Sequence, residues 1–331
     1  MAKKQTINKQ TTTKQKTGKS LMQKEKKFRV LLKNKTKLVI TVITSLGLLS
    51  LLSGCNMTLL DPKGIIAAAE KQLLIDSTLL MLIVVIPVII LAVVIAWKFR
   101  ASNSQSKYSP NWSHSTILEL VWWAIPMVII LILAVMTWRS THKLSPYRPL
   151  DVKGKPMIVQ VVALEWKWLF IYPEQDIASV NFLQIPVDVP VRFLITSDAP
   201  MNSFAIPSLA GQIYAMGGMQ TRLNVLATET GDYRGFSANY SGDGFSGMHF
   251  VTRVSSLNDF NQWVNTVKQS PSRLSIDAYN KLAKPSEKQP VEYFSSVQNK
   301  LFKLTIMKYT TPGIANPDGS IKDNLTLTNG K

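Results

Sequence analysis

The side chains that could bind a transition metal or carry redox chemistry are few in this sequence. Its 331 residues include one cysteine, Cys55, and three histidines, His114, His142 and His249. A single cysteine excludes an intramolecular disulfide. It also excludes a metal centre that needs two thiolates from this chain. The pool of strong transition-metal ligands in this chain is therefore very thin.

Two other positions are chemically informative because of the apolar segments beside them. Glu119 stands immediately before a long apolar run that begins at Leu120. Ionisable residues where a helix enters a membrane are costly and are often functional, which makes Glu119 a candidate functional residue. An acid in the first turn of a helix also suits the helix dipole, so a purely structural role stays open.

Cys55 lies at the end of a sequence typical of a secretory signal. Residues 1–37 hold 13 of the 38 Lys and Arg residues and one acid, Glu25, and the apolar run Leu38–Leu52 follows. A positive region, an apolar core and small residues define such a signal. The string Leu52-Ser-Gly-Cys55 resembles the lipobox of bacterial lipoproteins, whose cysteine is acylated and becomes the mature N-terminus. We expect residues 1–54 to be a leader and Cys55 to be lipidated; a buried cysteine in a membrane helix is the alternative.

Two uncharged apolar runs follow the signal, at about 77–97 and 120–138. They predict a membrane hairpin over residues 55–150. Each run is close to the ~20 residues that cross a bilayer core. Tryptophans near the span ends fit an interfacial belt, and membrane segments argue against reading the basic leader as a nucleic-acid arm. Positive charge does not orient the hairpin, but a lipidated Cys55 places both termini outside and the connecting loop in the cytoplasm.

Beyond the hairpin, residues 151–255 read as many short strands. Runs such as 157–162 and 191–196 are rich in β-branched residues and are separated by Pro and Gly, which predicts an antiparallel sandwich or barrel. Residues 256–310 then predict aromatic-rich helices, including a capping box at Ser256–Asp259 and an apolar stripe over 291–301. Residues 311–331 are polar, and we expect this tail to be disordered.

Several strings, in a shared order from about Cys55 to Tyr309, resemble subunit II of the haem–copper respiratory oxidases. They are Trp112-Ser-His114, Glu119-Leu-Val-Trp122, Glu165-Trp-Lys-Trp168, Ser197-Asp198, Asn202-Ser-Phe204, Pro207-Ser-Leu209, Gly235-Phe236 and Asn239-Tyr-Ser-Gly-Asp-Gly244. The resemblance implies an α+β membrane protein in which a two-helix transmembrane hairpin is followed by an external cupredoxin-like antiparallel β-sandwich with C-terminal helices.

In the cytochrome c oxidase branch of this family the sandwich binds a dinuclear copper centre, which needs two bridging thiolates. Here every side-chain ligand position is altered: Asn202 replaces a histidine, Asn239 and Asp243 the cysteines, Ser241 the glutamate, Gly247 the second histidine and Phe250 the methionine. His249 is offset by two residues and reads as a surface histidine. Trp166 and Trp168, an electron-accepting region in the copper branch, are expected to pack against the catalytic subunit.

These departures resemble the quinol oxidase branch, of the cytochrome bo ubiquinol oxidase type. The resemblance implies a non-catalytic second subunit of a proton-pumping quinol:oxygen oxidoreductase in the bacterial cytoplasmic (inner) membrane, with its C-terminal domain on the periplasmic side. It further implies that this chain binds no cofactor and that the haems and copper lie in subunit I. The expected partners are subunits I, III and IV, membrane lipid and quinol, and no nucleic acid. Glu119 matches a family glutamate at the mouth of a proton channel. A cytochrome c oxidase subunit II and a non-enzymatic lipid-anchored envelope binding module are the alternatives.

Overall fold

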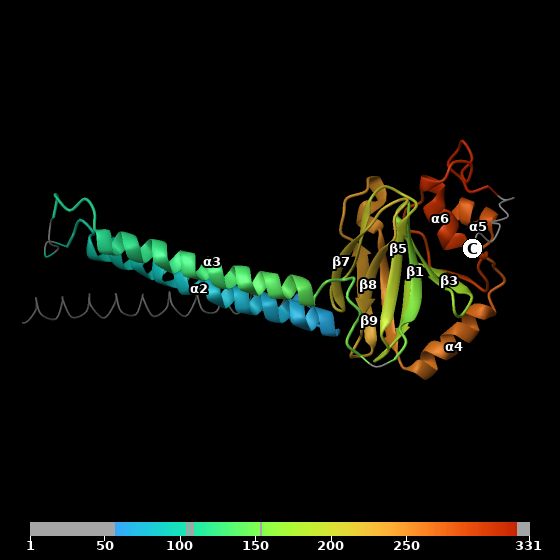
Figure 1. Cartoon of the computed structure of the whole chain (residues 1–331), viewed down its shortest axis with the longest axis horizontal. Coiled ribbons are helices and arrows are strands. Elements are labelled where there is room, and N and C mark those ends of the chain that lie inside the picture. The colour runs from blue at the N-terminus through green and yellow to red at the C-terminus, as the bar shows by residue number, and fades with distance from the viewer. Residues whose placement is uncertain (1–56, 104, 106–108, 153, 323–331) are drawn as a thin grey trace, which may run out of the picture. The chain divides into compact units, whose positions relative to one another are not determined.

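The computed structural model describes residues 57–103, 105, 109–152 and 154–322. The leader, the signal and Cys55 lie outside the described residues, as do residues 323–331 of the polar tail. Two long helices, α2 (Ile65–Lys98) and α3 (Thr116–Lys143), pack against each other in the first part of the described chain (Figure 1).

Both helices are long and apolar enough to cross a membrane. They are longer than the expected spans at both ends, and Pro87 and Pro126 lie inside them. Of their residues only Ala67 and Ile129 are buried. Helices that are apolar on every side fit a lipid or protein environment rather than water. The chain is thus a membrane protein with two spans and an external domain.

The start of α2 is fixed to the β domain by backbone hydrogen bonds. Lys63 N donates to Ser208 O at 2.7 Å, and Ala67 N donates to Leu209 O at 3.3 Å. Between them Gly64 approaches so closely that a Cβ there would lie 2.4 Å from Leu209 O. Glycine is therefore required at this contact.

Two facing sheets make the external domain a cupredoxin-like β-sandwich. One sheet has the order β11-β3-β2-β1-β5-β8 and the other the order β4-β10-β9-β6-β7. The strands are β1 (Met157–Leu164), β2 (Lys167–Tyr172), β3 (Ile177–Val180), β4 (Phe182–Pro186), β5 (Val191–Ser197), β6 (Asn202–Ile206), β7 (Ala210–Ala215), β8 (Thr221–Val225), β9 (Gly231–Ser237), β10 (His249–Ser255) and β11 (Glu292–Phe294).

Most strand pairs are antiparallel, as the sequence predicts, but β1 with β5 and β4 with β10 are parallel. The core between the sheets is aromatic. Trp168, Phe204 and Phe250 are buried there, with the rings of Phe204 and Phe250 stacked at 5.3 Å. Aromatic contacts of this kind add to the stabilisation from buried area alone.

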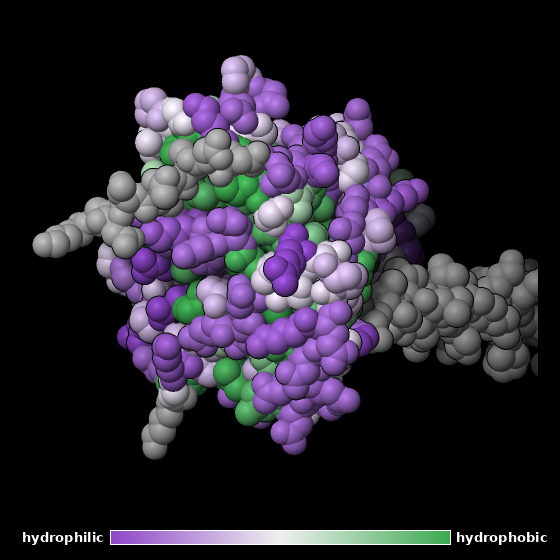
Figure 2. Space-filling model, turned by 90° about the vertical axis from the view of Figure 1, so that its right-hand side faces the viewer, coloured by the Kyte–Doolittle hydropathy of each residue, from purple (hydrophilic) through white to green (hydrophobic). Residues whose placement is uncertain are grey.

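The C-terminal region comprises α4 (Leu257–Lys268), α5 (Ile276–Leu282), β11 and α6 (Leu301–Thr310). The helices α5 and α6 cover the outer side of the six-stranded sheet, β11 extends the edge of that sheet, and α4 packs beside β3 and β4 against the core between the sheets. Ser256 caps α4, because its Oγ accepts from Asp259 N at 3.1 Å, which confirms the predicted capping residue. The side of the β domain shown in Figure 2 is mainly hydrophilic with scattered hydrophobic patches, so most apolar side chains of the region are turned inward.

Two expectations for this region were wrong. The stripe over 291–301 is not a helix, because Glu292–Phe294 pair with the free edge of β3 as strand β11. Residues 311–322 are folded rather than disordered: Ile321 is fully buried, and its backbone exchanges hydrogen bonds of 2.8 and 2.9 Å with the Asn280 amide. A few apolar residues that find a packing site override a polar average composition.

Candidate functional site

The altered copper-ligand positions come together at one end of the sandwich. Asn202 opens β6, Asn239 and Ser241 lie in the loop after β9, and Phe250 follows at the start of β10. Asp243 and Gly247 bound the short helix η3 (Asp243–Gly247) between that loop and β10. The hydrogen bonds below hold this end of the sandwich together.

The amide side chains at two of these positions make hydrogen bonds to neighbouring segments. Asn202 is fully buried; its Oδ1 accepts from Ser237 Oγ at 2.8 Å and its Nδ2 donates to Pro200 O at 2.7 Å. Asn239 Nδ2 donates to Met201 O at 2.9 Å, which joins the loop to β6. Both amides are thus used in structural hydrogen bonds.

The loop is also closed by an indole. Trp166 Nε1 donates to Ser241 O at 3.0 Å, and the ring lies against Gly244, where a Cβ would be 2.4 Å from it. Trp166 holds a left-handed backbone at φ 60°, a strained conformation for a bulky residue. The Ser241 hydroxyl is buried and has no hydrogen-bond partner within the described residues.

The remaining positions carry none of the thiolate, imidazole or thioether groups of a copper centre. Phe250 is buried in the aromatic core, Gly247 has no side chain, and Asp243 is exposed. His249 is exposed at the first position of β10, a surface histidine as expected. No group of three or more His, Cys, Asp or Glu residues that could hold a metal ion occurs in the described part of the chain. The residues present do not fit a thiolate-bridged copper pair.

The tryptophan pair is divided between two environments, which corrects the expectation that both pack against a partner. Trp168 is fully buried between the sheets, with its ring 5.3 Å from Phe204 and 5.8 Å from Phe250. Only Trp166 is partly exposed. Trp168 therefore stabilises the sandwich itself and cannot contact another subunit.

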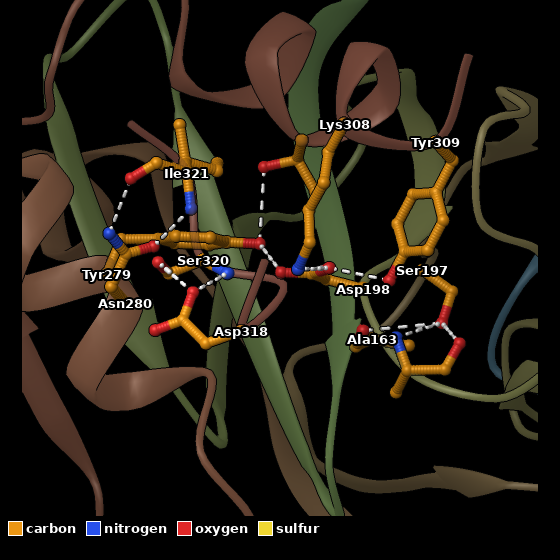
Figure 3. A network of polar contacts seen from close by, with 12 residues as sticks. Ala163, Ser197, Asp198, Tyr279, Asn280, Lys308, Tyr309, Asp318, Ser320 and Ile321 are labelled. Carbon is orange, nitrogen blue, oxygen red and sulfur yellow. Dashed lines mark hydrogen bonds and ion pairs between the residues drawn. The ribbon is translucent and has the colours of Figure 1, made fainter. Parts of the chain in front are cut away.

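A buried polar network that sequence reasoning missed attaches the C-terminal region near this end of the sandwich (Figure 3). The Asp198 side chain is fully buried and forms an ion pair with Lys308 of α6. It also accepts hydrogen bonds of 2.7 Å from the hydroxyls of Tyr279 and Tyr309. Burial, and then the Asp198 carboxylate, raise the pKa of both tyrosines above the ordinary value, so they remain donors.

A second buried charge lies on β2, which β1 separates from β5 in the sheet. Lys167 is 1% exposed, and its Nζ donates to the backbone oxygens of Leu282 and Lys284 at 2.9 and 2.7 Å, at the end of α5. Burial lowers the pKa of Lys167, and burial raises the pKa of the neighbouring Glu165. Two cations therefore contribute to the attachment of the C-terminal helices to the sandwich.

Glu119 lies in the first turn of α3, and its backbone N–H donates to Ser115 O at 2.9 Å. Its side chain is half-buried, and Ser115 is the N-cap residue of the helix. The first-turn position of Glu119 suits the dipole of α3, and it is equally compatible with a role in proton transfer. Glu119 stands near the start of α3, whereas the copper-ligand positions lie in the sandwich.

Two family models match the chain: "Cytochrome C oxidase subunit II, periplasmic domain" over residues 175–255 and "COX Aromatic Rich Motif" over residues 268–313. The second covers the segment that carries α5, β11 and α6. Two membrane-length helices, the sandwich and this aromatic-rich region define the class of terminal oxidase second subunits.

Curated relatives narrow the class. The chain is 54% identical to cytochrome bo(3) ubiquinol oxidase subunit 2 of Pseudomonas putida, over 81% of this chain and 85% of that protein. It is 51% identical to ubiquinol oxidase subunit 2 of Acetobacter aceti, over 83% and 91% of the two chains. It is 37% identical to quinol oxidase subunit 2 of Bacillus anthracis, over 72% and 84%. The chain belongs to the family of bo3-type ubiquinol oxidase subunit 2.

Proposed function

We propose that this chain is the non-catalytic second subunit of a proton-pumping oxidase that oxidises ubiquinol and reduces oxygen to water. The observation that carries the proposal is the combination of 54% identity to a bo(3) ubiquinol oxidase subunit 2 with the replacement of the thiolate and imidazole ligands at every former ligand position. Electrons would reach the haems and copper of subunit I directly from membrane quinol. This chain would contribute assembly and a cover over the outer face.

The local chemistry of the sandwich supports a copper-free role. Asn202 and Asn239 spend their amide groups on hydrogen bonds that close the loop, and Phe250 fills the core. An amide that turned toward a metal would have to break these hydrogen bonds, which costs free energy where the groups are buried. The former ligand loop thus keeps its fold through hydrogen bonds and packing.

We further propose that the complex lies in the bacterial cytoplasmic membrane, with the sandwich on the periplasmic side and a lipid on Cys55. Subunits I, III and IV would be its partners, as the resemblance implies. The two spans would supply most of the membrane attachment and the lipid would add to it, since one acyl chain alone binds a membrane only weakly. Radiolabelled palmitate incorporation into the wild type but not into Cys55→Ser tests the anchor; equal labelling would contradict it.

Glu119 is proposed as a proton-collecting carboxylate where the second span begins. A carboxylate at an aqueous mouth can pass protons while its pKa stays near the ambient pH. We expect Glu119→Ala to lower steady-state oxidase turnover, with partial recovery in Glu119→Asp, and the matched dipole control Asp259→Ala to leave turnover unchanged. Wild-type turnover and pumping in Glu119→Ala would remove this role.

Affinity purification in mild detergent tests the main proposal. A tagged chain should bring down partners with haem absorption bands and with ubiquinol oxidase activity. Absence of haem from the purified material would favour an envelope binding module instead. Oxidation of reduced cytochrome c by the same material, at the rate of a competent oxidase, would favour the cytochrome c branch.

A further inference from the structure

A cleft of about 900 Å³ lies where the hairpin meets the sandwich. Its walls are the start of α2, the end of α3, the linker 145–152 and the edges of β7 and β8. The cleft lies at the sandwich ends of both spans, which is the level of a membrane–water interface. None of the functions described above uses it.

One wall of this cleft is cationic. Arg139 stands three and four residues before His142 and Lys143, so all three lie on one side of the C-terminal end of α3. Trp138 lies beside them, 70% exposed, with its ring 4.5 Å from that of His142. An exposed indole next to basic side chains is typical of the lipid headgroup region.

The two acidic residues that line the cleft form no ion pair with Arg139 or Lys143. Glu70 accepts a hydrogen bond from the backbone N–H of Gly211, and Asp151 pairs with Arg148 at 2.9 Å. Neither Arg139 nor Lys143 takes part in an ion pair within the described residues. Two cations therefore face the cleft without an anionic partner from this part of the chain.

The side of the cleft formed by β8 and the linker 145–152 is held in place by hydrogen bonds. Asn224 Nδ2 of β8 donates to Pro146 O at 2.9 Å and to Arg148 O at 3.0 Å, which holds the linker against the sandwich. Asn224 Oδ1 in turn accepts from Arg192 Nε at 3.2 Å. A cleft with one side tied by hydrogen bonds is formed before any ligand binds, which lowers the entropic cost of binding.

We propose that this cleft binds an anionic phospholipid from the outer leaflet, with Arg139 and Lys143 holding the phosphate. The apolar lining residues Ile65, Ile66 and Leu150 suit the glycerol and upper acyl region. The exposed apolar surfaces of α2 and α3 continue the path for the acyl chains. A phosphate binds through charge-assisted hydrogen bonds, which Arg and Lys provide. The proposal rests on the membrane hairpin and not on the oxidase reaction.

Native mass spectrometry of the purified complex tests the proposal, with phosphatidylglycerol and phosphatidylcholine added in separate series. A surface Lys or Arg contributes to anionic lipid binding by about fivefold in affinity, so Arg139→Gln/Lys143→Gln should weaken phosphatidylglycerol binding about 25-fold. Lys268→Gln/Arg273→Gln removes the same charge from exposed positions on the C-terminal region and should bind as the wild type does. The charge-preserving Arg139→Lys/Lys143→Arg variant should also bind, which excludes misfolding as the cause of a loss.

Three results would overturn the proposal. The first is equal phosphatidylglycerol binding by Arg139→Gln/Lys143→Gln and by the wild type. Phosphatidylcholine could bind as tightly as phosphatidylglycerol, in which case the cations would serve only the C-terminal dipole of α3. Soluble glycerol 3-phosphate could displace the lipid at equal concentration, which would assign the cleft to a free phosphate.

Discussion

Replacing Asp198 with alanine removes the acceptor at the centre of the network that joins the sandwich to its C-terminal helices. The Asp198 side chain is fully buried and that of Lys308 is 12% exposed, so the lysine ammonium would lose its partner away from water. Removing one member of a buried ion pair costs roughly 3–5 kcal/mol, because the other charge is left uncompensated. The hydroxyls of Tyr279 and Tyr309 would lose their acceptor as well.

A free-energy loss of this size is readily measured. At ~2–4 °C per kcal/mol for a domain of about this size, Asp198→Ala should lower the melting temperature of the external domain by about 10 °C. Scanning fluorimetry of the detergent-solubilised complex reports the shift, and trypsin sensitivity of α5 and α6 reports which part opens. Glu174→Ala breaks a surface ion pair with Lys155 and serves as the control, with an expected loss below ~1 kcal/mol.

The double variant Asp198→Ala/Lys308→Met distinguishes the mechanism. Without the ammonium no buried charge is left uncompensated, so we expect roughly half of the lost stability to return. A loss below ~1 kcal/mol in Asp198→Ala, or no recovery in the double variant, would refute the claim that this ion pair holds the C-terminal region in place.

Three further expectations concern single positions in the external domain. Gly235→Ala should cost ~1–3 kcal/mol by thermal unfolding, because a Cβ there would lie 2.0 Å from the Phe250 ring; an unchanged melting temperature would contradict the packing described. Ser256→Ala should cost ~0.5–2 kcal/mol by the same measurement, through the lost N-cap of α4, and Ser256→Asp should restore it. Arg253 lowers the pKa of the half-exposed Asp232, so the pair stabilises the fold above the ordinary Asp pKa of about 3.9 and loses this effect as pH falls through the lowered value. Asp232→Asn should therefore cost at most ~1 kcal/mol at pH 7 in denaturant unfolding, and the difference from wild type should vanish in acid; a difference that grows in acid would refute this sign.

Local chemistry explains why much of the fold was predictable from sequence. Runs of β-branched residues at 157–162 and 191–196 became β1 and β5, because such side chains favour the pleated backbone. Ser256 was recognisable as a helix cap from its own neighbours. The altered copper-ligand positions were identifiable only through the resemblance to the oxidase family, and the structure brings those positions to one end of the sandwich.

What could not be predicted depends on contacts between segments far apart in the chain. Lys167 alternates with two tryptophans and so reads as exposed, yet the C-terminal region buries it beneath the backbone oxygens of Leu282 and Lys284. The spacing of Phe294 and its neighbours fits a helix, but pairing with the open edge of β3 makes it a strand. The partners Asp198 and Lys308 are 110 residues apart, and no local pattern links them. Tertiary packing overrides local periodicity in each case.

Copper content of the purified full-length chain tests the central claim most directly, namely that this oxidase subunit carries no metal centre of its own. After incubation with copper and removal of the excess, we expect no stoichiometric copper in the chain and no mixed-valence signal in electron paramagnetic resonance. The Asn202→His/Asn239→Cys/Asp243→Cys variant serves as the positive control for copper binding, since it restores one imidazole and two thiolates at three altered positions. A pair of coppers bound per wild-type chain would contradict the account.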